Sequence, residues 1–88
     1  MMRDNKLSAP IYKILLLFED TQNEASNIKE QDYLNYLDRL SVRYLGCSNI
    51  EIYQTIRGLY LLGSEAHHDT VKRAVFHIIN LVQKEAIQ

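Results

Sequence analysis

Apolar residues recur along this chain at intervals of three and four, the spacing that places side chains on one face of an α-helix. The first face of this kind consists of Ile11, Ile14, Leu15 and Phe18. Its arc is widened by Tyr12, Leu16 and Leu17. A helix this broadly apolar, predicted over residues 9–20, is expected to be covered by several helices or by a second subunit. Ser8 is its predicted N-cap, and Pro10 lies in the predicted first turn, where a backbone N–H would have no helical acceptor.

Three later segments repeat the helical spacing. Over 28–45 the apolar positions are Tyr33, Leu34, Leu37, Leu40 and Tyr44. Over 49–62 they are Ile52, Ile56 and Leu59, and over 65–85 they are Val71, Ala74, Val75, Ile78 and Val82. The polar stretch 20–27 is rich in residues that favour turns. The pattern therefore predicts four helices joined by short connections.

Two pairs of residues have the spacing of a capping box, in which each residue satisfies a free backbone amide of the other. Ser48 with Glu51 forms the first pair, and Asn27 with Glu30 forms the second. These pairs predict where the second and third helices begin.

Gly46 and Gly63 follow the predicted second and third helices, where access to the left-handed conformation would end a helix. No segment shows the alternation of a strand. We therefore expect an all-α fold: a small bundle of four helices, packed antiparallel because the connections are short. It is expected to form a single domain over residues 1–88, with 1–8 as a flexible N-terminus.

Size and composition favour self-association. The chain has 88 residues, of which 47% are hydrophobic, so it is small yet too apolar to be disordered. A second copy would bury the excess apolar surface, and we expect a homodimer. Phe76 and Ile79 flank the main stripe of the last helix and are the candidate interface. The alternative is a wide core in which the first helix covers them.

Charge and hydropathy limit the partners. A net charge of −1 argues against a protein dominated by phosphate contacts, although weak DNA binding at a local basic face stays open. Residues 39–88 carry six Lys/Arg and four Asp/Glu, giving +2, and are the part expected to meet an acidic partner. The longest unbroken apolar run, Ile14 to Phe18, is far shorter than the roughly 18 residues of a membrane span, so no membrane contact is expected.

Cys47 is the only cysteine, so the chain can form no intrachain disulfide and no multi-cysteine metal site. This usage favours the reducing cytoplasm. Cys47 precedes the third predicted helix, where a thiolate would be favoured, so it is either redox-sensitive or a small buried hydrophobic residue.

The histidines offer little catalytic or metal-binding chemistry. Neighbouring side chains on a helix point about 100° apart, so His67 and His68 are not expected to share a metal ion, and Glu65 to Asp69 is expected to be a solvated first turn. The neighbours of His77 along its helix are Arg73 and Asn80, which provide no orienting carboxylate. We therefore expect no enzymatic activity, no cofactor and no metal.

Tyrosine and arginine, the residue types that dominate binding hot spots, recur on the second and third predicted helices. The candidate partner-binding residues are Tyr36, Arg39, Arg43, Tyr53, Arg57 and Tyr60. Arg39 and Arg43 repel each other at i, i+4, and an acidic partner protein or a phosphate would relieve this. The alternative is that the tyrosine rings cap the core and the arginines stack on them.

The later part of the chain, roughly its last 60 residues, resembles the AriR/YmgB family of small enterobacterial regulators of biofilm formation and acid resistance, also called two-component-system connector proteins. The matching residues are Leu45, Gly46, Ile56, Leu59, Asp69, Val71, Lys72, Arg73, Val75, Ile78 and Ile79. The resemblance implies a homodimer that acts in transcriptional control, through a response regulator or transcription factor or weakly through DNA.

A second hypothesis comes from the front of the chain. In that family the N-terminal stretch is largely polar, whereas residues 11–18 here predict a strong helix. Four helices are typical of bacteriocin-immunity-like bundles of similar size and helix order. The alternative function is therefore protection of a cell that produces a bacteriocin or toxin.

Overall fold

The described part of the chain forms a bundle of four helices. The computed structural model describes residues 4–23, 26–46 and 49–87. Within them lie α1 (Asp4–Asn23), α2 (Asn27–Arg43), α3 (Ile50–Leu62) and α4 (His68–Ile87), with a short 3₁₀ turn, η1 (Gly63–Glu65), between α3 and α4. These described residues contain no strand. The predicted all-α fold class is confirmed.

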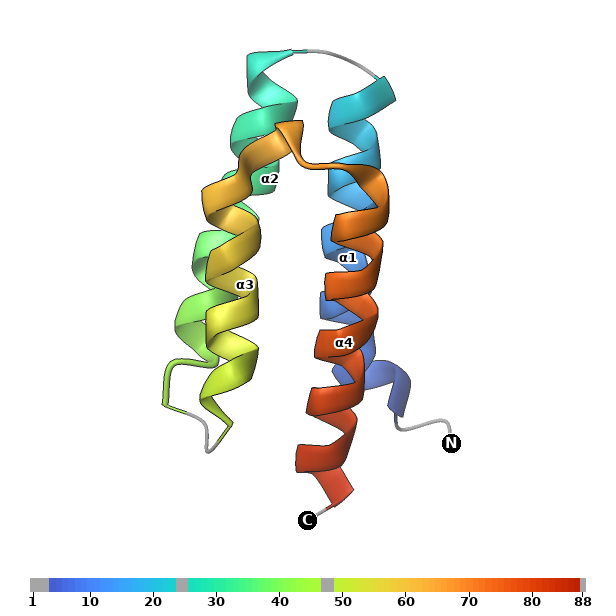
Figure 1. The fold of residues 1–88 in the computed structure, drawn as a ribbon, viewed down its shortest axis with the longest axis vertical. Coiled ribbons are helices and arrows are strands. Elements are labelled where there is room, and N and C mark those ends of the chain that lie inside the picture. The colour runs from blue at the N-terminus through green and yellow to red at the C-terminus, as the bar shows by residue number, and fades with distance from the viewer. Residues whose placement is uncertain (1–3, 24–25, 47–48, 88) are drawn as a thin grey trace.

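Each helix packs against its two neighbours around the bundle: α1 contacts α2 and α4, and α3 contacts the same two. Figure 1 shows the connections at alternate ends of the bundle and both chain termini at one end. No helix in the described part of the chain is long and apolar enough to cross a membrane.

One core runs through the middle of the bundle, and every helix contributes to it. Its buried apolar residues are Ile11, Ile14, Phe18, Tyr33, Leu37, Leu40, Ile52, Ile56, Leu59, Val71, Val75, Ile78, Ile79, Leu81 and Val82. Most of the predicted positions are confirmed, whereas Leu15, Leu34, Tyr44 and Ala74 pack at its edge. Burying a large apolar side chain contributes about 1.5–3 kcal/mol, so this core is the main source of stability.

Tyr33 is the one polar-tipped aromatic residue in the centre of this core. Its ring lies 5.5 Å from that of Phe18, and its side chain is fully buried. Among the described residues, its hydroxyl has no hydrogen-bond partner. Burial raises the pKa of Tyr33 to about 12, because the phenolate form is poorly solvated there.

The start of α1 differs from the prediction. The helix begins at Asp4 rather than near residue 9, so Ser8 and Pro10 lie inside it. The predicted cap at Ser8 is therefore wrong, and residues 4–8, predicted as part of a flexible N-terminus, are helical. Proline lacks an N–H and its ring crowds the preceding turn, which bends a helix. Figure 1 shows the first residues of α1 turned away from the axis of the rest.

The start of α2 is shifted by one residue from the prediction. Ser26, not Asn27, is the N-cap, and its Oγ accepts a hydrogen bond from the N–H of Lys29 at 3.2 Å. Glu30 does not complete a capping box. Its carboxylate instead accepts a hydrogen bond from the hydroxyl of Ser64 in η1 at 2.6 Å.

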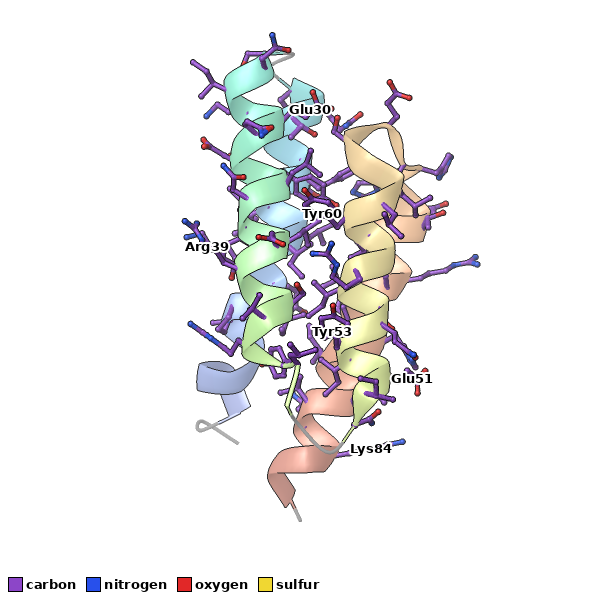
Figure 2. The ribbon with its side chains drawn as sticks, turned by 90° about the vertical axis from the view of Figure 1, so that its left-hand side faces the viewer. Glu30, Arg39, Glu51, Tyr53, Tyr60 and Lys84 are labelled. Carbon is purple, nitrogen blue, oxygen red and sulfur yellow. The ribbon has the colours of Figure 1, made fainter. Side chains whose placement is uncertain are left out.

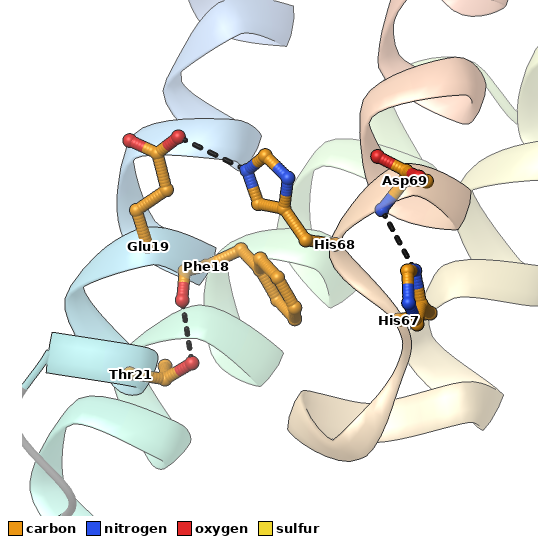
Figure 3. A network of polar contacts seen from close by, with 6 residues as sticks. All are labelled: Phe18, Glu19, Thr21, His67, His68 and Asp69. Atoms are coloured by element: carbon orange, nitrogen blue, oxygen red, sulfur yellow. Dashed lines mark hydrogen bonds and ion pairs between the residues drawn. The ribbon is translucent and has the colours of Figure 1, made fainter.

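That bond belongs to a polar network that ties α1, α2 and η1 together at one end of the bundle. The amide nitrogen of Gln22 donates both to the carbonyl of Ser64, at 2.9 Å, and to the hydroxyl of Thr21, at 3.0 Å. The Thr21 hydroxyl donates in turn to the carbonyl of Phe18 at 2.6 Å. Figure 3 shows this last bond beside the contact between α1 and α4.

The turn between α2 and α3 differs from the prediction at both of its ends. Gly46 has no positive φ and lies in a turn, so the predicted left-handed stop is wrong there, and α2 already ends at Arg43. Asn49 caps α3, accepting from the N–H of Glu51 at 3.0 Å. Ser48, the predicted cap, lies outside the described residues.

The end of α3 is as predicted. Gly63 has φ 74° and ψ −171°, a conformation that is essentially restricted to glycine, and its N–H donates to the carbonyl of Leu59. The chain then forms η1, so α4 begins at His68 rather than at residue 65.

Candidate partner-binding surface

A stripe of charged and aromatic side chains follows α2 along its α1 side. Asp32, Tyr36, Arg39 and Arg43 are spaced i, i+4, i+7 and i+11, which keeps them on one side of a helix. Lys13 approaches Tyr36 from α1. We call these five residues the α1/α2 stripe. A shallow hollow at its centre is also lined by Leu17 and Asn35.

Tyr36 is the fixed centre of the stripe. It is half-buried, and its hydroxyl donates to the backbone carbonyl of Pro10 in α1. The ammonium of Lys13 lies 5.3 Å from the centre of its ring, within range of a cation–π contact. Burial raises the pKa of Tyr36, against the opposing effect of the Arg43 and Arg39 charges. Arg39 lies one turn from Tyr36 along α2, and Arg43 lies two turns from it.

Arg39 and Arg43 themselves are exposed. Neither forms an ion pair with another residue of the described ranges 4–23, 26–46 and 49–87. Like charges one turn apart on a helix repel each other mildly, so each guanidinium keeps its full capacity to bind an external acceptor.

On the α2/α3 side of the bundle, arginine and tyrosine side chains are engaged in contacts within the fold. Arg57 of α3 forms an ion pair with Asp38 of α2, with Nη1 2.8 Å from Oδ1. Its guanidinium carbon lies 4.5 Å from the ring centre of Tyr60. Tyr53 and Tyr60 are half-buried and lie between α2 and α3 (Figure 2). These contacts agree with the alternative interpretation, in which rings cap the core and an arginine stacks on them.

The six predicted partner-binding residues therefore do not form one surface. Figure 2 shows Arg39 projecting from the side of α2 that faces away from α3, whereas Tyr53 and Tyr60 lie between the two helices. Spacing within each helix places the residues of that helix on one side, but it does not show which sides of two helices meet.

The two residues of the predicted dimer interface differ in exposure. Ile79 is only 7% exposed in the single chain and belongs to the core, as the wide-core alternative expected. Phe76 is 38% exposed, and its ring meets that of Tyr12 in α1 edge to face, with centres 5.6 Å apart. Leu16, also on α1, is 61% exposed.

The two histidines at the start of α4 point to different partners (Figure 3). His67 Nδ1 accepts from the N–H of Asp69 at 3.2 Å, which caps the helix start. His68 Nε2 lies 3.2 Å from a carboxylate oxygen of Glu19 in α1. Among the described residues, no three side chains of the metal-binding types gather as a metal site would require.

His77 has a carboxylate partner that sequence reasoning missed. Its Nε2 lies 2.7 Å from a carboxylate oxygen of Glu51 in α3. The two residues are 26 positions apart, so no spacing within one helix could have indicated the contact. Both side chains are about half exposed, and a surface pair of this kind contributes roughly 0.2–1 kcal/mol. The contact links the surfaces of α3 and α4.

Cys47 lies outside the described residues, so its two predicted roles stay open.

Comparison of the chain with protein-family models, curated proteins and solved structures gives no significant match. The α1/α2 stripe is therefore the candidate binding surface of this chain.

Proposed function

We propose that this chain is a small non-enzymatic regulatory protein of the cytoplasm that binds a partner protein through the α1/α2 stripe. One observation carries the proposal: Arg39 and Arg43 are exposed and form no ion pair within the described residues, and they stand beside a tyrosine fixed by its hydrogen bond to Pro10. Rigid aromatic rings beside arginines are the usual anchors of protein interfaces.

A protein partner is favoured over nucleic acid. The chain carries a net charge of −1, and Asp32 lies within the stripe itself. A polyphosphate backbone would be repelled by that carboxylate, whereas a protein segment can present charges of both signs. Weak, strongly salt-dependent DNA binding remains the expected upper limit for nucleic acid.

The resemblance of the later part of the chain to connector proteins supports a role in bacterial stress signalling, with a response regulator or transcription factor as the partner. One observation favours the alternative of an immunity protein: α1 is a full member of the bundle, and Ile11, Ile14 and Phe18 are completely buried in its core. The neighbouring genes distinguish the two. A toxin or bacteriocin gene supports immunity, and regulator genes support signalling.

A homodimer is part of the proposal. Tyr12, Leu16 and Phe76 are large apolar side chains exposed on α1 and α4, and a second copy would remove them from water. Phe76→Asp is expected to convert a dimer to a monomer in sedimentation at high micromolar concentration, with unchanged helicity by circular dichroism. A wild-type protein that sediments as a monomer at that concentration would exclude the dimer.

The partner-binding proposal is tested by replacing both free arginines. Arg39→Ala with Arg43→Ala is expected to reduce capture of the partner at least tenfold, because two unshared charges are lost, while helicity stays unchanged. The matched control is Lys72→Ala with Arg73→Ala, a second pair of exposed cations, on α4. Unchanged capture by the Arg39/Arg43 variant, or equal loss in the control, would refute the proposed surface.

A further inference from the structure

The α1/α2 stripe has a fixed order of charge along α2. Asp32 comes first, Tyr36 follows one turn later, and Arg39 and Arg43 follow at one-turn intervals. Asp32, like the two arginines, forms no ion pair with another described residue. The stripe therefore presents a negative end and a positive end, both available to a partner.

From this order we propose that the stripe binds a helical segment of mixed charge, with a cation at one end and carboxylates at the other. The inference rests on the proposed function and names the chemistry of the partner. The partner's cation lies against Asp32, and its carboxylates lie against Arg39, Arg43 and Lys13.

The spacing on α2 fixes the spacing on the partner. Asp32 and Arg39 are seven residues apart, which is about 10 Å along a helix, and Arg43 lies about 6 Å further on. A helix packed alongside presents its own side chains at the same intervals of three and four. For a partner helix that runs parallel to α2, the matching pattern is a Lys or Arg at position i, with Glu or Asp at i+7 and i+11.

An apolar residue completes the pattern between the charges. Tyr36 and Leu17 are both half-buried and line the middle of the hollow, flanked by the charged residues. The partner residue above them, at i+3 or i+4, is therefore apolar, because it meets the Tyr36 ring and the Leu17 side chain, and contact with them removes apolar surface from water. The segment recognised is thus an amphipathic helix rather than a uniformly acidic tail.

The test uses two fluorescein-labelled helical peptides of 18 residues. The mixed-charge peptide has Lys at i, Leu at i+4 and Glu at i+7 and i+11. The all-acidic peptide differs only in having Glu at i. Fluorescence anisotropy with the full chain is expected to give about threefold tighter binding of the mixed-charge peptide, the size of one exposed ion pair.

Reversing the charge at Asp32 is expected to reverse this preference. Asp32→Lys should bind the all-acidic peptide more tightly than the mixed-charge peptide and should gain affinity for a 12-base-pair DNA duplex. The control, Asp69→Lys on α4, changes the net charge by the same amount and is expected to keep the wild-type preference.

Equal binding of the two peptides by the wild type would overturn the proposal that a cation of the partner lies against Asp32. A preference unchanged by Asp32→Lys would overturn it too. Failure of both peptides to bind, or of the mixed-charge peptide alone, would overturn it as well. Each of these results leaves the proposed function standing as long as the Arg39/Arg43 variant still loses partner capture. If that variant captures the partner normally, the α1/α2 stripe is not the binding surface. Failure of the proposed function is therefore distinguishable from failure of the charge order alone.

Discussion

The two sides of α2 use the same residue types for different purposes. On the α3 side, Arg57 is held by the carboxylate of Asp38 and the ring of Tyr60, so its charge is satisfied within the fold. On the α1 side, Arg39 and Arg43 lie beside Tyr36 with no ion pair to any described residue. An arginine one or two turns from a tyrosine is therefore not in itself a binding signal. An arginine is available to a partner only where no neighbouring helix places a carboxylate beside it.

Tyr33, on the buried side of α2, extends this comparison. Its ionisation gives the largest expected change in the free energy of unfolding. Tyr33 has a buried hydroxyl with no partner among the described residues, and its pKa is raised to about 12 by burial. The unfolded chain ionises near 10, so the folded state retains the proton more strongly. The stability that Tyr33 provides is complete below pH 10 and is lost as the pH rises from 10 to 12, amounting to about 3 kcal/mol in total.

Tyr33→Phe removes this loss of stability at alkaline pH, because phenylalanine does not ionise. At neutral pH the variant should be as stable as the wild type or slightly more stable, since it removes an unpaired buried hydroxyl. Urea unfolding at pH 7 and pH 11 measures both effects, with Tyr53→Phe, at a half-buried position outside both proposed surfaces, as the control. A wild type and a Tyr33→Phe variant that lose the same stability at pH 11 would contradict the assignment.

Arg57→Ala gives the next largest effect. The substitution removes one partly exposed ion pair and one cation–π contact, which together contribute about 1 kcal/mol. For a domain of this size, that loss lowers the melting temperature by about 4–8 °C. The control is Arg39→Ala, for which we expect a change within about 0.5 kcal/mol. Equal destabilisation by the two substitutions would remove the distinction between the two sides.

Gly58→Ala is expected to give the smallest effect, and in the stabilising direction. Gly58 lies inside α3, and a Cβ atom added there would meet nothing within 4 Å. Alanine favours a helix over glycine by about 0.5–1 kcal/mol. Thermal unfolding should show a higher melting temperature, with partner capture unchanged because Gly58 lies in α3, away from the α1/α2 stripe. A lower melting temperature would show that α3 packs more tightly there than the structure indicates.

Sequence periodicity was enough to predict the four helices and most of the core. Burial every three or four residues is a local property, so Ile52, Ile56 and Leu59 could be placed on one face from the sequence. The ends were less predictable. Ser26 and Asn27 are both good caps, and the choice between them depends on how the chain leaves α1, which no local pattern records.

The candidate site could be predicted only in part. Tyr36, Arg39 and Arg43 were identified by their spacing on one helix, whereas the contributions of Lys13 and Pro10 come from α1 and depend on how the two helices pack. Arg57 was grouped with the site because the sequence does not show that Asp38 lies opposite it. Contacts between helices were the information that the sequence lacked.

The central claim is that α2 has a binding side and a structural side. It is tested most directly by measuring partner capture and melting temperature together for two variants, Arg39→Ala with Arg43→Ala and Arg57→Ala alone. We predict that the double variant loses capture at an unchanged melting temperature, and that Arg57→Ala melts lower but captures the partner normally below its melting temperature. The reverse outcome, or equal changes in both variants, would contradict the claim.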